Sequence, residues 1–248
     1  MKQKKIRTKK TVKVIINIIL TLITVLSAGV FISNESKYTL DFSYPKELRQ
    51  LYENNSEARE FVLSYHEEKN KEHIIDLSEH KDDTTMPLFL QWDKRWGFTD
   101  YGGECAAVSA CGPLCLSMVG YYLTKNEELF SPDKVIQFAK EEGYCLFNSG
   151  TSWSLMSDGA EDLGLTSEVL PLDENIIINA LKDNKPIVLI MGPGNFTSSG
   201  HFIVLTEYKE GKFSVNDPNS PKRSKKLWSY NEICNEIMNI WAFSYNMK

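Results

Sequence analysis

The amino-acid sequence predicts an α+β domain that is preceded by one membrane-spanning helix. Two observations carry this prediction. Between residues 86 and 248, patterns typical of helices come first and patterns typical of strands cluster late. Near the N-terminus, residues 14–32 form a run of 19 residues without a charged side chain. The composition, with 42% hydrophobic and 25% charged residues, excludes wholesale disorder and collagen-like repetition.

The net charge of −5 combines two opposed parts of the chain. Residues 1–13 hold seven of the 28 basic side chains and no acidic one. The remaining 21 basic residues face 33 acidic residues, so the rest of the chain carries −12. An acidic body argues against nucleic acid as a partner, because binding to phosphates requires a basic face.

Residues 14–32 are long enough to cross the hydrocarbon core of a bilayer as a helix. A core helix would show a polar face, and this stretch shows none. The basic residues before it and Glu35 after it predict a single-pass protein of the cell membrane, with residues 1–13 cytoplasmic and the body extracytoplasmic. A cleaved signal peptide is the alternative, which would make the protein secreted, with Ser27 and Gly29 as small residues of a cleavage site. The length of the apolar run favours the uncleaved anchor.

Residues 33–85 form a strongly charged segment. Apolar residues spaced three and four apart between Leu48 and Tyr65 predict an amphipathic helix that is opened by Pro45. We interpret the segment as a charged helical stalk or as a helical preface packed on the main domain. From residue 86 onward, aromatic residues, glycines and short apolar runs become dense, so we place the start of the main domain, 86–248, there.

Helices are predicted in the first part of the main domain. The first begins at Pro113, because the missing N–H of proline costs nothing in the first turn of a helix. Capping residues and glycines predict three further helices, at 132–143, 154–163 and 173–181.

Strands follow the helices. The sequence predicts a buried strand at 186–191, a β-hairpin of 201–207 and 212–217, a helix around 230–238 and a last strand at 240–245. With the hairpin turn near residues 209–210, antiparallel pairing places His201 opposite residues 217 to 220. The His201 ring and the Asp217 carboxylate then lie at the same edge of the sheet, where the carboxylate could orient the ring. A strand-end histidine and a turn aspartate without a function are the plain alternative.

Cys111 lies immediately before the predicted start of a helix. Unpaired N–H groups and the macrodipole at such a position stabilise a thiolate. Cys111, His201 and Asp217 therefore supply a nucleophile, a proton carrier and an orienting carboxylate. Cys105 is the main competitor as nucleophile, but no helix is predicted to begin after it. Cys115, one helical turn beyond Cys111, is expected to be a buried apolar residue.

Acyl transfer also needs hydrogen-bond donors for the oxyanion. The N–H of Cys111 is one candidate and the side-chain amide of Gln91 is the second, although a surface glutamine is the default interpretation. The five cysteines are odd in number, so at least one thiol is expected to be free. No metal or cofactor is expected, because no Cys-x-x-Cys pair is present and the spaced histidines His66, His73 and His80 have no second ligand cluster.

Five short motifs occur in the main domain: Gln91-Trp-Asp-x-x-Trp-Gly97, Ala110-Cys-Gly-Pro-x-Cys115, Gly150-Thr-Ser-Trp153, Gly200-His-Phe-Ile-Val-Leu205 and Val215-Asn-Asp-Pro-Asn-Ser220. Together they resemble the C39-like cysteine peptidases, a family with a papain-like fold that is named for domains removing double-glycine leaders from bacteriocins. The resemblance covers about residues 86–245. It implies Cys111 as nucleophile, His201 as general acid and base, Asp217 as the residue that orients His201, and Gln91 as oxyanion donor.

Two departures limit what the resemblance implies. The chain has no Gly-x-x-x-x-Gly-Lys-Ser/Thr phosphate loop, so ATP is not an expected partner, and only one spanning segment is predicted. The sequence therefore looks like a stand-alone, membrane-anchored member without an ABC transporter, for which a double-glycine substrate does not follow. We expect an extracytoplasmic cysteine peptidase that hydrolyses a peptide or protein substrate through a thioester. A non-catalytic peptide-binding surface module and a cell-wall amidase or transpeptidase with the same triad are the alternatives.

Overall fold

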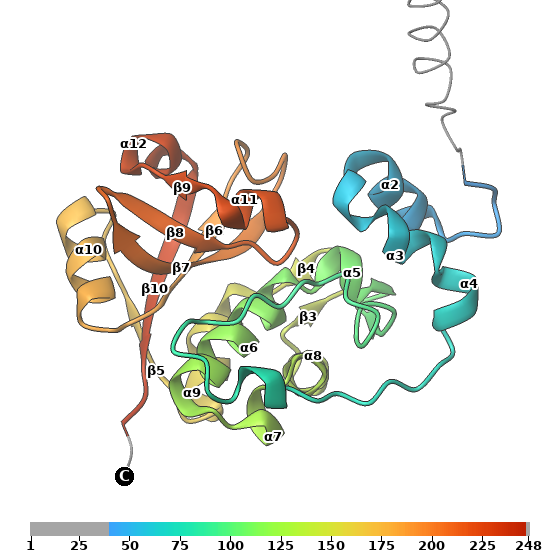
Figure 1. Cartoon of the computed structure of the whole chain (residues 1–248), viewed down its shortest axis with the longest axis horizontal. Coiled ribbons are helices and arrows are strands. Elements are labelled where there is room, and N and C mark those ends of the chain that lie inside the picture. Colours follow the sequence, from blue (N-terminus) through green and yellow to red (C-terminus); the bar gives the residue numbers. More distant parts are fainter. Residues whose placement is uncertain (1–39, 247–248) are drawn as a thin grey trace, which may run out of the picture. The chain divides into compact units, whose positions relative to one another are not determined.

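The computed structural model describes residues 40–246 (Figure 1). The predicted basic tail, 1–13, and the predicted anchor, 14–32, lie outside these residues. Within 40–246, no helix has both the length and the apolar character needed to cross a membrane. The chain from Tyr44 onward forms one compact unit.

The preface, which we define as residues 44–85, is helical in its first half. It contains α2 (Lys46–Asn54), the 3₁₀ turn η1 (Ser56–Ala58), α3 (Arg59–Leu63), α4 (Tyr65–Glu68) and a later 3₁₀ turn, η2 (Ser78–His80). Pro45 precedes the first helix, as predicted. The single helix predicted from Leu48 to Tyr65 is wrong, because Asn55 has extended backbone angles (φ −127°, ψ 98°) and its side chain accepts the N–H of Glu57. The apolar residues of this pattern are nevertheless the ones that pack inward: Leu48, Ala58, Phe61 and Val62 are all buried.

The helical part of the main domain extends from residue 100 to residue 162. Its elements are β1 (Asp100–Tyr101), β2 (Glu104–Cys105), α5 (Ala106–Ser109), α6 (Cys111–Thr124), α7 (Glu127–Phe130), α8 (Pro132–Glu141), β3 (Cys145–Leu146), β4 (Gly150–Thr151), η3 (Trp153–Met156) and α9 (Asp158–Asp162). Helix α6 begins two residues before the predicted start at Pro113, which still lies in the first turn. The helix predicted over 154–163 is divided at Ser157, whose backbone angles are not helical.

The sheet follows in the second half of the chain. Its elements are β5 (Thr166–Val169), α10 (Glu174–Lys182), β6 (Ile187–Met191), β7 (His201–Lys209), β8 (Lys212–Asn216), α11 (Pro221–Lys225), β9 (Leu227–Trp228), α12 (Tyr230–Ile233), η4 (Cys234–Glu236) and β10 (Ile237–Ser244). The six strands are ordered β5-β10-β6-β7-β8-β9, and every neighbouring pair is antiparallel (Figure 1). The predicted α+β class, with helices first and an antiparallel sheet last, is confirmed.

The C-terminal helix is shorter than predicted. Helix α12 ends at Ile233, and residues 237–244 form a strand that pairs with both β5 and β6. Residues 237 and 238, which the sequence predicted as part of a helix over 230–238, therefore belong to the sheet. The strands β5 and β9 and the helix α11 were not predicted.

The hairpin of β7 and β8 has the predicted register. Val204 lies opposite Asn216 and Leu205 opposite Val215, and a bulge shifts the pairing before Glu207. His201 is the first residue of β7, and Asp217 directly follows the last residue of β8. The hairpin therefore brings these two residues to the same edge of the sheet.

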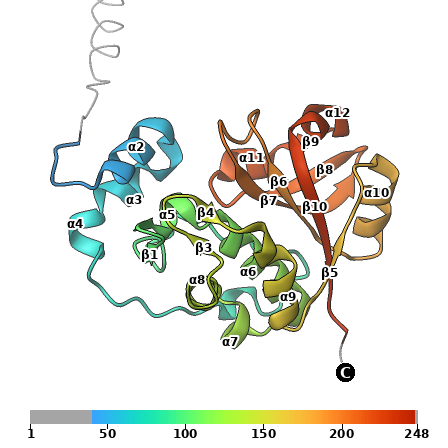
Figure 2. The same ribbon diagram turned by 180° about the vertical axis from the view of Figure 1, so that it is seen from behind.

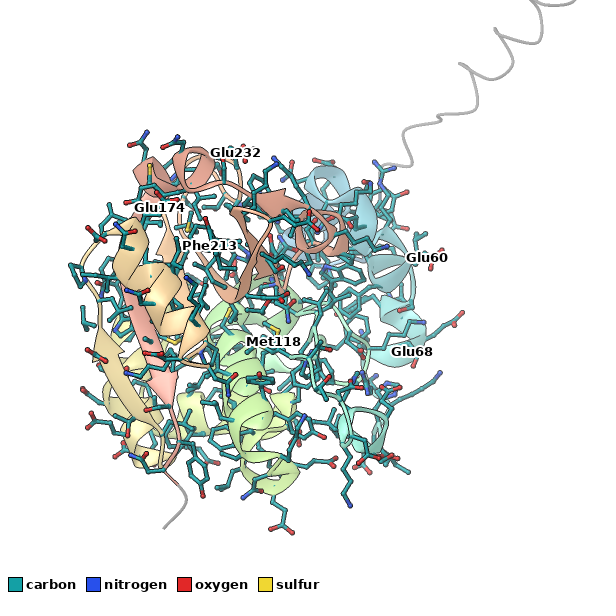
Figure 3. All side chains as sticks on the ribbon, turned by 60° about the vertical axis from the view of Figure 1, so that its left-hand side comes forward. Glu60, Glu68, Met118, Glu174, Phe213 and Glu232 are labelled. Atoms are coloured by element: carbon teal, nitrogen blue, oxygen red, sulfur yellow. The ribbon has the colours of Figure 1, made fainter. Side chains whose placement is uncertain are left out.

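The sheet separates two hydrophobic cores. Val188 and Ile190 of β6 pack in the core that contains α6, whereas Ile187 and Leu189 pack in the core that contains α10. This alternation follows from the period of two in a strand, and it explains why every residue of β6 is buried. Figures 1 and 2 show α6 and α10 on opposite sides of the sheet, and Figure 3 labels one side chain from each core, Met118 and Phe213.

Candidate active site

Three elements bring Cys111, His201 and Asp217 together. Cys111 is the first residue of α6, and α6 packs against β7, whose first residue is His201. Asp217 follows β8, the neighbour of β7 in the sheet. The candidate site is thus located where the N-terminus of a buried helix meets one edge of the sheet.

His201 is held by Asp217. The His201 Nε2 atom lies 2.8 Å from Asp217 Oδ1, and the two residues are 6% and 0% exposed. Burial disfavours the charged imidazole, but the charge of Asp217 and its hydrogen bond outweigh burial and raise the pKa of His201 to about 10. His201 is therefore an imidazolium at neutral pH, with Nε2 committed to Asp217.

The Cys111 thiol is adjacent to this imidazolium. Burial opposes ionisation of Cys111, but the hydrogen bond and the charge of His201 hold the pKa of the thiol below its ordinary value. The backbone N–H groups of Phe202 and Gly112 also lower the pKa of the thiol. Because Asp217 occupies Nε2, Nδ1 is the ring nitrogen left for the thiol. These surroundings favour the ion pair of thiolate and imidazolium, the state in which a cysteine is most nucleophilic.

Asp217 has an additional partner that the sequence did not reveal. The Nε atom of Arg223, on α11, donates to Asp217 Oδ2, while the N–H of Asn219 donates to Oδ1 at 2.8 Å. Burial raises the pKa of Asp217, but the charges and hydrogen bonds of His201 and Arg223 lower it below its ordinary value. Pro221 could have signalled a helix start, but no pattern in the sequence shows that α11 turns Arg223 back onto Asp217.

Gln91 connects the two halves of the site. It is 2% exposed, so the surface interpretation of Gln91 is wrong. Its backbone N–H donates to Pro218 O at 2.8 Å, next to Asp217, and its Nε2 donates to Ala107 O at 2.6 Å. The chain leaves helical geometry at Ala110, between α5 and α6. In an unbroken helix, the carbonyl of Ala107 would accept the N–H of Cys111, four residues later. Here the side chain of Gln91 binds that carbonyl instead.

The Gly150–Trp153 motif packs against the first turn of α6, next to Cys111. Thr151, on β4, packs on Gly112, where an added Cβ would lie 2.8 Å from Thr151 Cγ2. Thr151 Oγ1 is 2.9 Å from the hydroxyl of the buried Tyr101. Glycine at position 112 therefore allows β4 to approach the residue that follows the cysteine.

The other cysteines lack the surroundings of Cys111. The prediction that no helix begins after Cys105 is wrong, because α5 starts at Ala106. Burial and the charge of Glu47 nevertheless raise the pKa of Cys105 to about 12, against hydrogen bonds from backbone N–H groups. Burial and the negative charges nearby also raise the pKa of Cys115. All five cysteines lie within the described residues and are free, which confirms the prediction of at least one free thiol.

Within 40–246, no group of three or more His, Cys, Asp or Glu side chains is arranged to hold a metal.

Comparison with known proteins adds three findings. Residues 84–247 match the model of the Peptidase C39 like family. The peptidase domain of Streptococcus ComA, a bi-functional ABC transporter involved in a quorum-sensing pathway, has a TM-score of 0.43 and 15% identity, over 65% of this chain and 99% of that one. A protein of Bacillus anthracis described as a C39-like peptidase has a TM-score of 0.41 and 14% identity, over 66% and 97%.

No curated protein matches the chain. The family assignment therefore rests on the family model, which covers more than half of the chain and includes all the residues of the site described above. The structure, with a helical part followed by an antiparallel sheet, fits the papain-like α+β fold that the sequence motifs imply. The chain belongs to the Peptidase C39 like family.

Proposed function

We propose that the protein is a cysteine peptidase whose nucleophile, general acid and base, and orienting carboxylate are Cys111, His201 and Asp217. One observation carries the proposal. The buried His201 joins the Asp217 carboxylate, at 2.8 Å, to the Cys111 thiol, in a chain that belongs to a peptidase family. This is the arrangement that nucleophilic catalysis by cysteine requires.

The reaction has two halves. In the first, the Cys111 thiolate attacks the carbonyl carbon of the scissile amide, and the resulting tetrahedral oxyanion collapses as His201 gives its proton to the leaving amine. The C–N bond breaks and a thioester to Cys111 remains. In the second, neutral His201 takes a proton from water as the oxygen of that water attacks the thioester. The C–S bond breaks, the thiolate and imidazolium form again, and the carboxylic acid product leaves and loses its proton to solvent.

Two donors serve the oxyanion in this proposal. The N–H of Cys111 lies at the start of α6, beyond the break at Ala110. The Gln91 amide uses one of its two hydrogens on Ala107 O, at 2.6 Å, which leaves the second for the substrate. The bond to Ala107 fixes the orientation of the amide before substrate binds, so that little reorganisation is needed as charge develops.

Asp217 and Arg223 maintain the charge state of the site. Asp217 fixes the ring of His201 through Nε2 and stabilises the imidazolium. Arg223 holds the second carboxylate oxygen, which keeps Asp217 ionised although it is fully buried. Arg223 thus acts through Asp217 and is a positioning residue.

The peptidase is tethered to the cell membrane in this proposal. Residues 14–32 form the anchor and residues 1–13 the cytoplasmic tail, so that the domain acts on the extracytoplasmic side. The support is the uncharged run and the seven basic residues before it. Membrane fractionation, followed by protease treatment of intact cells, tests this: a full-length protein in the soluble fraction, or a domain protected from external protease, contradicts it.

The activity is tested by profiling the full-length protein on a peptide library that includes double-glycine sequences, with Cys111→Ala as the control. Turnover that disappears in the control supports the proposal. Peptide binding without turnover or thiol reactivity supports a non-catalytic module instead. Turnover confined to peptidoglycan stem peptides supports a cell-wall amidase or transpeptidase.

A further inference from the structure

We propose that the preface is part of the catalytic apparatus, because Asn55 and Glu57 position the segment 217–223 that carries Asp217 and Arg223. This inference rests on the proposed function and adds two positioning residues to it. Both residues precede residue 84, where the family match begins, so the family model does not contain them.

Glu57 joins the preface to α11 through both oxygens of its carboxylate. Its Oε1 accepts the hydroxyl of Ser220 at 2.6 Å, and its Oε2 accepts the backbone N–H of Lys222 at 2.9 Å. Ser220 is 2% exposed, so its hydroxyl is removed from competing water. Two bonds from one carboxylate fix both position and direction, and hydrogen bonds to a charged group are stronger than neutral ones.

Asn55 holds the residue before Ser220. Its Nδ2 donates to the backbone O of Asn219 at 2.9 Å and to the Oδ1 of Asn219 at 2.8 Å. The backbone N–H of the same Asn219 donates to Asp217 Oδ1 at 2.8 Å. One residue therefore separates the preface from the carboxylate that binds His201.

The Glu57 contact leads to Asp217 by a second route. The hydroxyl of Ser220 donates a hydrogen bond to Glu57. The same hydroxyl oxygen accepts a hydrogen bond from the backbone N–H of Arg223, at 3.1 Å. The guanidinium of Arg223 then donates to Asp217 Oδ2. The two routes reach different oxygens of the carboxylate, Oδ1 through Asn219 and Oδ2 through Arg223. Together they define the plane of the carboxylate that orients His201.

The preface is itself fixed on the main domain. Phe61, on α3, stacks on Phe98 with ring centroids 4.1 Å apart. A Cβ on Gly97 would lie 2.7 Å from the Phe61 ring, so glycine at this position admits the ring. The apolar contact provides a rigid base for Asn55 and Glu57, which lie a few residues earlier. A rigid base is what positioning requires, since a displacement of about 1 Å can cost about 100-fold in rate.

Glu57→Gln tests the inference in the full-length protein. An amide has one acceptor oxygen, so the Ser220 hydroxyl and the Lys222 N–H can no longer donate to two separate oxygens, and the negative charge that strengthens both bonds is lost. We expect kcat to fall about tenfold with KM unchanged, because the substrate does not touch Glu57. We also expect the midpoint pH of Cys111 alkylation to rise, because a misplaced Asp217 stabilises the imidazolium, and through it the thiolate, less well.

The matched control is Glu60→Gln. Glu60 is exposed on α3, where Figure 3 shows it directed away from the body of the protein, and the substitution removes the same charge from the same segment. A second variant, Ser220→Ala, removes the other end of the contact. If Glu57 acts through Ser220, the loss in the double variant is smaller than the product of the two single losses, since the two changes share one contact.

Several outcomes overturn the inference. The first is that Glu57→Gln and Glu60→Gln have the same kcat and the same midpoint pH of Cys111 alkylation. The second is that the losses of kcat in Glu57→Gln and Ser220→Ala multiply fully in the double variant. If Glu57→Gln does not fold, as judged by its Tm, Asn55→Ala replaces it, because it removes the donor to both oxygens of Asn219, and an unchanged alkylation midpoint there contradicts the proposal. If the wild-type protein turns over no peptide, the proposed function fails by itself, while the alkylation midpoint still decides whether the preface positions Asp217.

Discussion

Arg223 and His201 bind opposite oxygens of one buried carboxylate. The Nε of Arg223 donates to Asp217 Oδ2, and the Nε2 of His201 donates to Oδ1 at 2.8 Å. Asp217 has no exposed surface, so these two cations and the Asn219 N–H replace the water that a carboxylate normally binds. In the order Arg223, Asp217, His201, Cys111, each member favours the ionised form of the next.

Replacing Arg223 should weaken both folding and turnover. Arg223→Ala leaves Asp217 Oδ2 buried without its cation, so we expect the free energy of unfolding to fall by about 1–3 kcal/mol. Turnover should fall at least tenfold through kcat. The measurements are urea unfolding and steady-state kinetics. Lys222→Ala, which removes an exposed cation from the same helix, is the control; a loss of the same size there would mean that Arg223 acts only through the general charge of α11.

Cys111 should be the fast-reacting thiol. Its pKa is held below the ordinary value by His201, whereas burial and Glu47 raise the pKa of Cys105 to about 12. At pH 7, iodoacetamide should therefore modify Cys111 at least tenfold faster than Cys105, as mass spectrometry of the labelled peptides would report. Cys111→Ala should abolish both the fast labelling and turnover, and Cys105→Ala should affect neither. Fast labelling that survives Cys111→Ala would assign the nucleophile to another cysteine.

The activity should have an alkaline limit that is set by His201. The imidazolium must hold a proton to give to the leaving amine, and Asp217 raises the pKa of His201 to about 10, so kcat should fall as pH rises through that value. On the acidic side, activity should fall as the Cys111 thiolate takes a proton, at a pH below the ordinary thiol pKa of 9.0.

Asp217→Asn checks the origin of both limits. Without the carboxylate charge, the pKa of His201 should decrease and that of Cys111 should increase, so the active range should contract from both sides. The pH profiles of kcat and of Cys111 alkylation measure the two limits separately. Limits that stay in place in Asp217→Asn would show that the Asp217 charge does not govern the pair.

The sequence predicted those parts of the fold and site that depend on local patterns. The predicted hairpin turn near residues 209–210 lies within one residue of the turn at 210–211, and this was enough to bring His201 and Asp217 to one edge of the sheet. The position of Cys111 at a helix start follows from Pro113, which fits a first turn. Both features depend on residues that are close in sequence.

The remaining parts depend on contacts between distant residues. Arg223 reaches Asp217 only because α11 turns back, and Glu57 reaches Ser220 across 163 positions. The strand at 237–244 replaced part of a predicted helix because β5 and β6 supply its hydrogen bonds, which no local pattern contains. The single helix predicted in the preface failed at Asn55, where a polar side chain competes for the backbone N–H of Glu57.

Glycine at position 112 should be required for stability, because Thr151 packs directly against it. A Cβ at position 112 would lie 2.8 Å from Cγ2 and 2.9 Å from both Cβ and Oγ1 of Thr151. Both residues are buried, so β4 or the first turn of α6 would have to move. For Gly112→Ala we expect a loss of about 1–3 kcal/mol in the free energy of unfolding, which is typical of overpacking.

The same substitution should slow labelling of Cys111, because the Gly112 N–H, which lowers the pKa of the thiol, is displaced with the helix turn. Adding Thr151→Ala removes two of the three close atoms and should recover part of both losses, whereas Thr151→Ala alone should cost less than Gly112→Ala. Thermal unfolding and the rate of iodoacetamide labelling measure the two effects. A double variant no better than Gly112→Ala would mean that the conformation of residue 112, and not its contact with β4, is what requires glycine.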